Sequence, residues 1–339
     1  MKTLILETPG RLALVDTPEP MDPGAGEVLV RIRRVGVCGT DIHAYRGEQP
    51  FFTYPRILGH ELGVEVEAIG DGVTHVSPGD ACAVEPYLTC GSCAACRLER
   101  TNCCESLQCL GVHTDGGMRE RITLPAPKVH ASAELSFDAL ALVETLGIGK
   151  HAVDRGGVGP GEVVAVIGLG PIGLTAAQFA LLSGARVVGV DISAARIDSA
   201  RRLLGIDGLT LQPDAPLPDQ WRDHFGELPR TVFDATGSRA SMQSAFGLPG
   251  NGATLVFVGL LPGQIAFDDP EFHRKELTLR ASRNSVGQDF REIIAHLESG
   301  RIDTRAWITH RTDAAAWPDV FERWLTPEAG LLKGVINFD

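Results

Sequence analysis

Short runs of alternating apolar and polar residues fill the first part of the chain, to about residue 148. Examples lie at residues 28–32, 64–66 and 82–84, with Gly, Pro and Asp turns such as 78–80 nearby. Alternation with a period of two is typical of strands that bury one face, and short strands between frequent turns favour a sandwich or barrel. The pattern therefore predicts a β-rich, partly open barrel over residues 1–148.

After Gly161 the pattern changes to continuous apolar runs that alternate with helical stretches. Strands are expected at residues 163–167, 187–190, 231–234 and 254–258, with helices at 172–183 and 194–204. Strands that are buried on both faces and joined by helices build a parallel sheet. We therefore expect an α/β, doubly wound domain over residues 149–289.

The C-terminal segment, residues 290–339, predicts a return to the first domain. It contains one further expected helix at 290–299 and a closing apolar strand at 334–338. The expected organisation is thus a β-rich domain that the α/β domain interrupts.

Composition indicates a soluble globular protein. The chain has 339 residues, of which 44% are hydrophobic and 22% charged, enough for two cores of ordinary size. Its net charge of −12 argues against a nucleic-acid or anionic-membrane partner. Residues 163–185 carry no charge and are long enough to span a bilayer, but glycines and a proline interrupt them, so we expect strand, turn and helix there. These features favour a cytoplasmic enzyme.

Four cysteines in one short polar segment have the spacing C-x2-C-x2-C-x7-C. They are Cys90, Cys93, Cys96 and Cys104. Four thiolates so spaced can close a tetrahedron around one Zn²⁺ and fix a loop that has no core of its own. Disulfides are the alternative, but a chain of this length can bury a core without them. We predict a structural zinc lobe at about residues 86–110 and interpret Cys82, Cys103 and Cys109 as packing residues. Cys103, next to Cys104, is the position at which the ligand assignment could shift.

A glycine-rich turn, Gly168-Leu169-Gly170-Pro171-Ile172-Gly173, follows an expected strand and precedes an expected helix. In a G-x-G-x-x-G turn the glycines permit the tight turn, the approach of a pyrophosphate and close helix–strand packing. Asp191 ends the next strand, where a carboxylate can bind the adenosine ribose and repel a 2′-phosphate. The sequence thus predicts an NAD site, with NADP as the less favoured alternative.

Two basic residues are further candidates for cofactor contacts. Arg196, five residues after Asp191, could flank the adenine or meet a 2′-phosphate. Lys333, just before the last strand, is predicted to reach the pyrophosphate. The alternative for each is a solvated side chain.

A second set of candidate zinc ligands lies outside the cysteine lobe: Cys38, the adjacent pair His60 and Glu61, and Glu144. A mixed set of this kind can leave one zinc position open, which catalysis requires. The alternatives are a buried His60 bonded to backbone and a Glu144 that only stabilises a helix N-terminus.

Two motifs, Cys38-Gly39-Thr40-Asp41-Ile42-His43 and Gly59-His60-Glu61, precede the cysteine lobe and the glycine-rich turn. In this order and spacing the chain resembles the zinc-dependent medium-chain alcohol dehydrogenases over essentially its whole length. The resemblance implies a GroES-like catalytic domain, a Rossmann-type NAD-binding domain, and one catalytic and one structural zinc. Glu61 and Glu144 are similar to those of the polyol and threonine dehydrogenase branch.

Shorter motifs resemble the bacterial L-galactonate 5-dehydrogenases within this branch. They are residues 54–61, 101–105, 111–117, 269–273 and 282–284. This resemblance implies a sugar-acid substrate whose secondary alcohol is oxidised to a ketone. Arg56 or Arg283 is then a candidate for holding the substrate carboxylate.

The expected chemistry begins with an alcohol whose oxygen must become alkoxide-like before a hydride can leave. Zn²⁺ supplies that stabilisation, with Cys38 and His60 as firm ligands and Glu61 or Glu144 alternating with water or substrate. Thr40 can pass on the alcohol proton and His43 can deliver it to solvent, a relay that in the family runs through the nicotinamide ribose. Asp41 is expected to orient His60.

Two other functions remain open. One is a threonine or small-diol dehydrogenase of the same family, and the other is a dinucleotide-binding protein without catalysis. The resemblance also implies a homo-oligomer, a dimer or a tetramer.

Overall fold

The computed structural model describes residues 1–48, 52–212, 215–326 and 329–339. The chain forms two compact units, one built from Met1–Glu144 with Val286–Asp339 and the other from Thr145–Ser285. The seams therefore lie four residues before the two expected at 148 and 289. The chain enters and leaves the second unit once, so its C-terminal part does return to the first unit.

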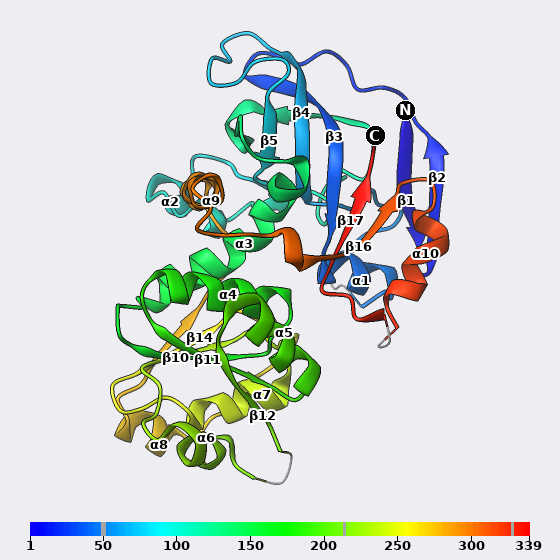
Figure 1. Cartoon of the computed structure of the whole chain (residues 1–339). Helices are drawn as coiled ribbons and strands as arrows, with labels where there is room; N and C mark the ends of the chain where they lie inside the picture. Colours follow the sequence, from blue (N-terminus) through cyan, green and yellow to red (C-terminus); the bar gives the residue numbers. More distant parts are fainter. Residues whose placement is uncertain (49–51, 213–214, 327–328) are drawn as a thin grey trace. The chain divides into compact units, whose positions relative to one another are not determined.

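The first unit is built on a mixed sheet, with the strand order β16-β17-β3-β4-β5-β9 and β8 paired to β3. Pairing within this sheet is antiparallel except between β16 and β17. Figure 1 shows β3, β4 and β5 side by side. Two small sheets, β1-β2 and β6-β7, complete this unit among the described residues. Its strands are β1 Lys2–Thr8, β2 Arg11–Asp16, β3 Glu27–Val37, β4 Glu61–Ile69, β5 Ala81–Val84, β6 Tyr87–Leu88, β7 Gln108–Cys109, β8 Arg121–Pro125, β9 Val129–Ala131, β16 Ile308–Asp313 and β17 Lys333–Asn337.

The predicted alternation explains how this sheet forms. Along β3 every second residue from Val28 to Ile32 is fully buried, while Leu29 and Arg31 between them are partly exposed. The buried side chains join a core that includes Leu4, Leu62 and, from the C-terminal segment, Trp317. The helices of this unit are α1 Gly39–Tyr45, α2 Ala94–Arg97, α9 Gly287–Glu298 and α10 Trp317–Trp324, and α3 Phe137–Gly156 crosses the first seam. Short 3-10 helices are η1 Thr101–Cys103, η2 Ala126–Lys128 and η4 Arg305–Trp307.

The second unit is a parallel sheet with the strand order β12-β11-β10-β13-β14-β15. In chain order this is 3-2-1-4-5-6, the doubly wound arrangement in which dinucleotides bind where the order reverses. The strands are β10 Val163–Ile167, β11 Arg186–Asp191, β12 Asp207–Thr210, β13 Thr231–Asp234, β14 Thr254–Phe257 and β15 Thr278–Ala281. The helices are α4 Pro171–Leu182, α5 Ala194–Leu204, α6 Leu217–Phe225, α7 Arg239–Ser244 and α8 Asp269–Arg274, with the 3-10 helix η3 Ala245–Gly247.

The expected fold class is confirmed: a Rossmann-type parallel sheet together with a β-rich unit. The uncharged stretch 163–185 divides into β10, a turn and α4, as expected. In the parts of the chain that the structure describes, no helix combines the length and the apolar character that crossing a membrane requires. The strands β12 and β15 and the long helix α3 were not anticipated, since Asp207–Thr210 and Thr278–Ala281 are short and not strongly apolar.

Candidate active site

Cys38, His60 and Glu61 come together in the first unit, with one ligand atom of each lying within 4.8 Å of the others. Cys38 directly follows β3 and is the N-cap of α1, while His60 and Glu61 stand where β4 begins. The antiparallel pairing of β3 and β4 sets Gly36 opposite Glu61 and so brings the two strand ends together. The sheet register thus assembles ligands that are more than twenty residues apart in sequence.

The Glu61 carboxylate is buried and bonded to a lysine from the other end of the chain. Lys333 Nζ lies 2.6 Å and 2.7 Å from its two oxygens and also donates to the Val37 carbonyl. Gly36 makes room for this contact, because a Cβ there would lie 2.1 Å from Glu61 Oε2. The cost of burying two opposite charges is offset only by contacts of this quality. Lys333 therefore has a different partner from the pyrophosphate that the sequence suggested, and that contact stays a prediction without support from this geometry.

His60 is buried, and its Nδ1 has no hydrogen-bond partner in the described structure. The nearest carboxylate oxygen, Asp41 Oδ1, lies 4.0 Å away and is also buried without a partner. Asp41 Oδ2 accepts from the Cys38 amide at 2.9 Å, which fixes Asp41 beside the histidine. Burial lowers the pKa of His60, but Cys38 and Asp41 outweigh it and raise that pKa well above its usual value.

These side chains fit a cation. A buried imidazole, a thiol and a carboxylate within 4.8 Å are the donor types that zinc prefers, and the unpartnered polar atoms around them show that the protein alone does not satisfy the site.

Glu144 does not belong to the group of three. It lies on α3, is buried, and its Oε1 accepts a hydrogen bond from the Tyr87 hydroxyl. Burial raises the pKa of this carboxyl. Cys109 is a neighbour that sequence analysis took for a packing residue: burial raises the pKa of its thiol to about 12, and both His60 and Glu144 influence it. Neither Tyr87 nor Cys109 has a sequence signal that would have placed it here.

The predicted relay residues lie on α1. Thr40 is partly buried, and His43 is exposed, with its Nδ1 2.9 Å from Glu48 Oε2. The helix begins at Gly39, directly after Cys38, so the relay candidates are held close to the first ligand by one turn of backbone.

The four cysteines of the lobe form a second group, with their sulfur atoms within 4.8 Å of one another. Cys104 Sγ lies 3.5 Å from Cys90 Sγ and accepts from the Cys90 amide at 3.3 Å. Hydrogen bonds from the amides of Ser92 and Cys93 lower the pKa of Cys90 to about 5, which favours the thiolate that binds metal. The adjacent Cys103 is exposed and outside this group.

The glycine-rich turn in the second unit connects β10 to α4. Gly168 has a φ of 86°, and a Cβ on Gly173 would lie 1.7 Å from the Gly168 carbonyl oxygen, so both positions require glycine. Gly170 is the N-cap of α4 and has open space around it, while Pro171 and Ile172 form the first turn of the helix. This leaves the helix N-terminus accessible to an anion.

Asp191 ends β11 and is buried. Its Oδ2 accepts from the Leu169 amide at 2.7 Å and its Oδ1 from the Ser193 amide at 2.9 Å. The carboxylate therefore also fixes the glycine-rich turn, a function that the sequence analysis did not assign to it. Arg196 Nη1 lies 3.7 Å from Oδ2 on an exposed side chain.

The two arginines proposed for a substrate carboxylate lie in different units. Arg56 belongs to the first, where Nη1 donates to Asp115 Oδ1 at 3.1 Å and Nη2 to Thr53 Oγ1 at 2.7 Å. Both terminal nitrogens of the Arg56 guanidinium are therefore already bonded to other side chains of the protein. Arg283 belongs to the second unit and is exposed.

Two ranges of the chain match known protein families. Residues 24–134 match the alcohol dehydrogenase GroES-like domain, and residues 171–299 match the zinc-binding dehydrogenase family.

Similar proteins cover the whole chain. L-galactonate-5-dehydrogenase of Escherichia coli K12 is 42% identical over 340 residues, covering 100% of this chain and 99% of the relative. A crystal structure of an alcohol dehydrogenase from Escherichia coli CFT073 in complex with NADH has a TM-score of 0.93 at 28% identity and covers 100% and 99% of the two chains. A zinc-binding dehydrogenase structure from Sinorhizobium meliloti bound to NADP has a TM-score of 0.86 at 27% identity, covering 99% and 98%.

Proposed function

The chain belongs to the zinc-binding, medium-chain alcohol dehydrogenase family and is an oxidoreductase of that family, and we propose that it oxidises a secondary alcohol of a sugar acid to a ketone with NAD. The observation that carries the proposal is the group Cys38, His60 and Glu61, whose ligand atoms lie within 4.8 Å of one another. L-galactonate is the substrate we favour, because the L-galactonate-5-dehydrogenase matches the chain from end to end at 42% identity.

Two zinc ions per chain are proposed, one held by Cys38 and His60 together with Glu61 or Glu144, the other by the four lobe cysteines. When bound, the first would stabilise negative charge on the alcohol oxygen, and the nicotinamide would take up the hydride. The chain itself supplies orientation. Asp41, fixed by the Cys38 amide, would orient His60 through its charge at 4.0 Å, and Lys333 holds the Glu61 carboxylate.

Glu144 is the better candidate for the exchangeable ligand. Glu61 has both oxygens bonded to Lys333, whereas among the described residues Glu144 accepts one hydrogen bond, from the Tyr87 hydroxyl. Breaking one hydrogen bond costs less than separating a buried ion pair. We propose that Glu61 stays with Lys333 and that Glu144 approaches and withdraws.

Proton removal is assigned to α1. The Thr40 hydroxyl would accept the substrate proton and His43 would release it to water, helped by the Glu48 carboxylate at 2.9 Å from its Nδ1. His43 is exposed, which suits the last position of a relay.

NAD is preferred to NADP in this proposal. The Asp191 carboxylate stands at the end of β11, where it would accept from the ribose hydroxyls and repel a phosphate. Arg196, only 3.7 Å from it, weakens this repulsion, so the preference is expected to be moderate. NADP-bound relatives such as the Sinorhizobium meliloti protein make the comparison of both cofactors essential.

We also propose that the protein forms a homo-oligomer and is located in the cytoplasm. We base the location on the eight cysteines, which form no disulfide in the described structure, since disulfides are rare in a reducing compartment. Sedimentation velocity would separate a monomer from a dimer or tetramer.

The test is a panel of substrates read by NADH absorbance: L-galactonate, its matched alditol galactitol, L-threonine and 2,3-butanediol. L-galactonate is expected to give the highest kcat/KM, and a preference for threonine or the diol would replace the substrate assignment. Arg56→Ala and Arg283→Ala should then be compared on the galactonate and galactitol pair. A loss confined to galactonate identifies the carboxylate-binding residue, and equal losses on both substrates remove that assignment.

A further inference from the structure

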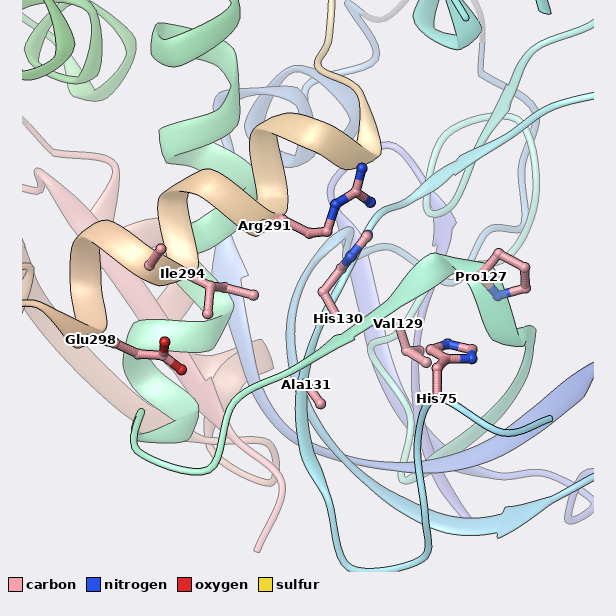
Figure 2. A pocket seen from close by; sticks show the side chains of 9 residues that line it. His75, Pro127, Val129, His130, Ala131, Arg291, Ile294 and Glu298 are labelled. Carbon is pink, nitrogen blue, oxygen red and sulfur yellow. The ribbon is translucent and has the colours of Figure 1, made fainter. Parts of the chain in front are cut away.

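A cavity of about 540 Å³ that is open to solvent lies in the first unit and is lined by none of the residues assigned above (Figure 2). Arg291, Ala295 and Glu298 at its rim are exposed. β9 forms one wall and α9 the other. On the helix side the lining residues are Arg291, Ile294, Ala295 and Glu298. This spacing of three, four and seven residues places all of them on one face of the helix. The face is apolar in its middle and carries a cation at one end and a carboxylate at the other.

The cationic end has unused donors. Arg291 Nη2 donates to Gln288 Oε1 at 2.7 Å, and within the described ranges the guanidinium has no carboxylate partner. A guanidinium that is open on one side of a cavity matches the two oxygens of a carboxylate. Figure 2 shows its side chain reaching the same corner as that of His130, which comes from β9.

His130 is buried, and its ring lies beside Glu85 and Phe290. Its Nε2 lies 3.5 Å from Glu85 Oε2, and Lys128 Nζ lies 2.5 Å from the other oxygen of that carboxylate. Stacking on Phe290, with ring centroids 5.1 Å apart, fixes the plane of the imidazole. Nε2 makes no hydrogen bond to the Glu85 carboxylate, and no described residue is bonded to Nδ1. Nδ1 is therefore left for a ligand hydroxyl, with which an imidazole nitrogen can pair as donor or as acceptor according to its tautomer.

Glu298 provides the opposite end. Its Oε1 accepts from the Ser132 hydroxyl at 2.7 Å, and no described residue donates to Oε2. Seven residues of helix separate Glu298 from Arg291, roughly 10 Å along the axis. Both side chains line the cavity.

We propose that this cavity binds a small hydroxy acid. Its carboxylate pairs with Arg291, a hydroxyl near the carboxylate pairs with His130 Nδ1, and a distal hydroxyl donates to Glu298. The carbon chain lies on the apolar middle formed by Val129, Ile294 and Ala295. An aliphatic acid without hydroxyls would leave His130 and Glu298 unpaired, and an alditol would leave Arg291 unpaired, so both should bind poorly.

The experiment is isothermal titration of the zinc-loaded enzyme with L-galactonate in the presence of saturating NADH, so that no turnover occurs. Two binding events per chain are expected, one at the catalytic group and one at the cavity. Arg291→Gln should weaken the second event by about tenfold or more while initial turnover stays unchanged. Arg301→Gln, an exposed arginine just after α9, is the matched control and should leave both events as they are.

One further variant and two further ligands test whether the second binding event belongs to the cavity. Ala295→Trp fills the cavity without removing a charge and should abolish the same event as Arg291→Gln. Galactitol and hexanoate should fail to bind at the cavity. A single event per chain that is lost in His60→Ala and kept in Arg291→Gln would overturn the proposal. If the protein does not oxidise L-galactonate, the event that depends on Arg291 is still expected, so the two proposals fail separately.

Discussion

The two groups of candidate zinc ligands are built in opposite ways. The lobe takes its four sulfur atoms from residues 90–104, a segment that contains only short helices and turns. The other group takes Cys38 from the end of β3 and His60 and Glu61 from the start of β4, and its carboxylate is bonded to Lys333, near the end of the chain. The lobe is therefore local in sequence, whereas the second group exists only once the large sheet has formed.

The two groups also differ in how far their residues are buried. Three of the lobe cysteines are at least partly exposed, and the small cluster beneath them contains Tyr87 and Leu107. His60, Glu61 and Lys333 are each at most 5% exposed. A site of the first kind holds a loop in place, while a site of the second kind has a fixed, dry environment in which charge has strong effects. Burial and countercharge, more than ligand type, therefore mark the group suited to catalysis.

The largest effect should follow from His60→Ala. It removes the buried imidazole from the second group and should lower kcat/KM by about 10³-fold or more, since the loss of one electrostatic contact in an active site already costs 10²–10³. Native mass spectrometry should show one zinc per chain in place of two. Circular dichroism should be unchanged, because the β3–β4 register does not depend on this side chain.

A variant that keeps both zinc ions and most of its activity would contradict the assignment of the catalytic group. His75→Ala, which removes an exposed histidine bonded to the Ala126 carbonyl, is a suitable control.

A substitution in the cysteine lobe should affect the stability of the protein more than its activity. Cys104→Ser should release the second zinc and lower the free energy of unfolding by about 4 kcal/mol, because loss of a structural metal belongs to the small class of severe changes. Activity measured well below the melting temperature should fall much less than in His60→Ala. The matched control is the adjacent, exposed Cys103, whose change to serine should alter stability by no more than about 0.5 kcal/mol.

If Cys103→Ser also releases zinc, the ligand set has been assigned one residue off. If Cys104→Ser abolishes turnover as fully as His60→Ala, the two groups are not functionally separate.

The contrast between the groups also explains how far sequence analysis could go. Local features were accessible: the spacing of the four cysteines, the strand before Gly168 and the helix after it follow from patterns within a few residues. The fold class followed as well, because alternating strands and helices permit few arrangements.

Long-range contacts were not accessible. Nothing in the segment before β17 indicates that Lys333 pairs with Glu61, since that contact depends on the register of β17, β3 and β4 and on the absence of a side chain at Gly36. The hydrogen bonds of Asp191 to the glycine-rich turn, and that of Tyr87 to Glu144, likewise depend on packing between segments that are distant in sequence.

Lys333→Met tests whether the countercharge is essential to the second group. It leaves the Glu61 carboxylate buried without its partner and should lower the free energy of unfolding by about 3 kcal/mol, near the lower end for a broken buried pair. Adding Glu61→Gln should recover a large part of this loss, which a double-mutant cycle in urea would measure. Stability that is unchanged in Lys333→Met would mean that Glu61 does not need the lysine.

The smallest expected effect concerns Tyr87, which contacts both regions. Tyr87 packs beside Cys104 in the lobe, and its hydroxyl donates to Glu144 near the catalytic group. Tyr87→Phe keeps the packing and removes the hydrogen bond, so stability should fall by only about 1–2 kcal/mol. We expect kcat to change by less than about tenfold, because Glu144 loses the donor that holds it back, and both zinc ions should remain.

Tyr54→Phe is the matched control, since that hydroxyl donates to the Ala44 carbonyl at 2.6 Å, outside both groups. It should cost a similar amount of stability without any change in kcat. Loss of a zinc in Tyr87→Phe alone would show that the lobe and the catalytic group are coupled through this hydroxyl. A change in kcat with both ions retained would instead support Glu144 as the ligand that moves, because Tyr87 is the side chain bonded to it.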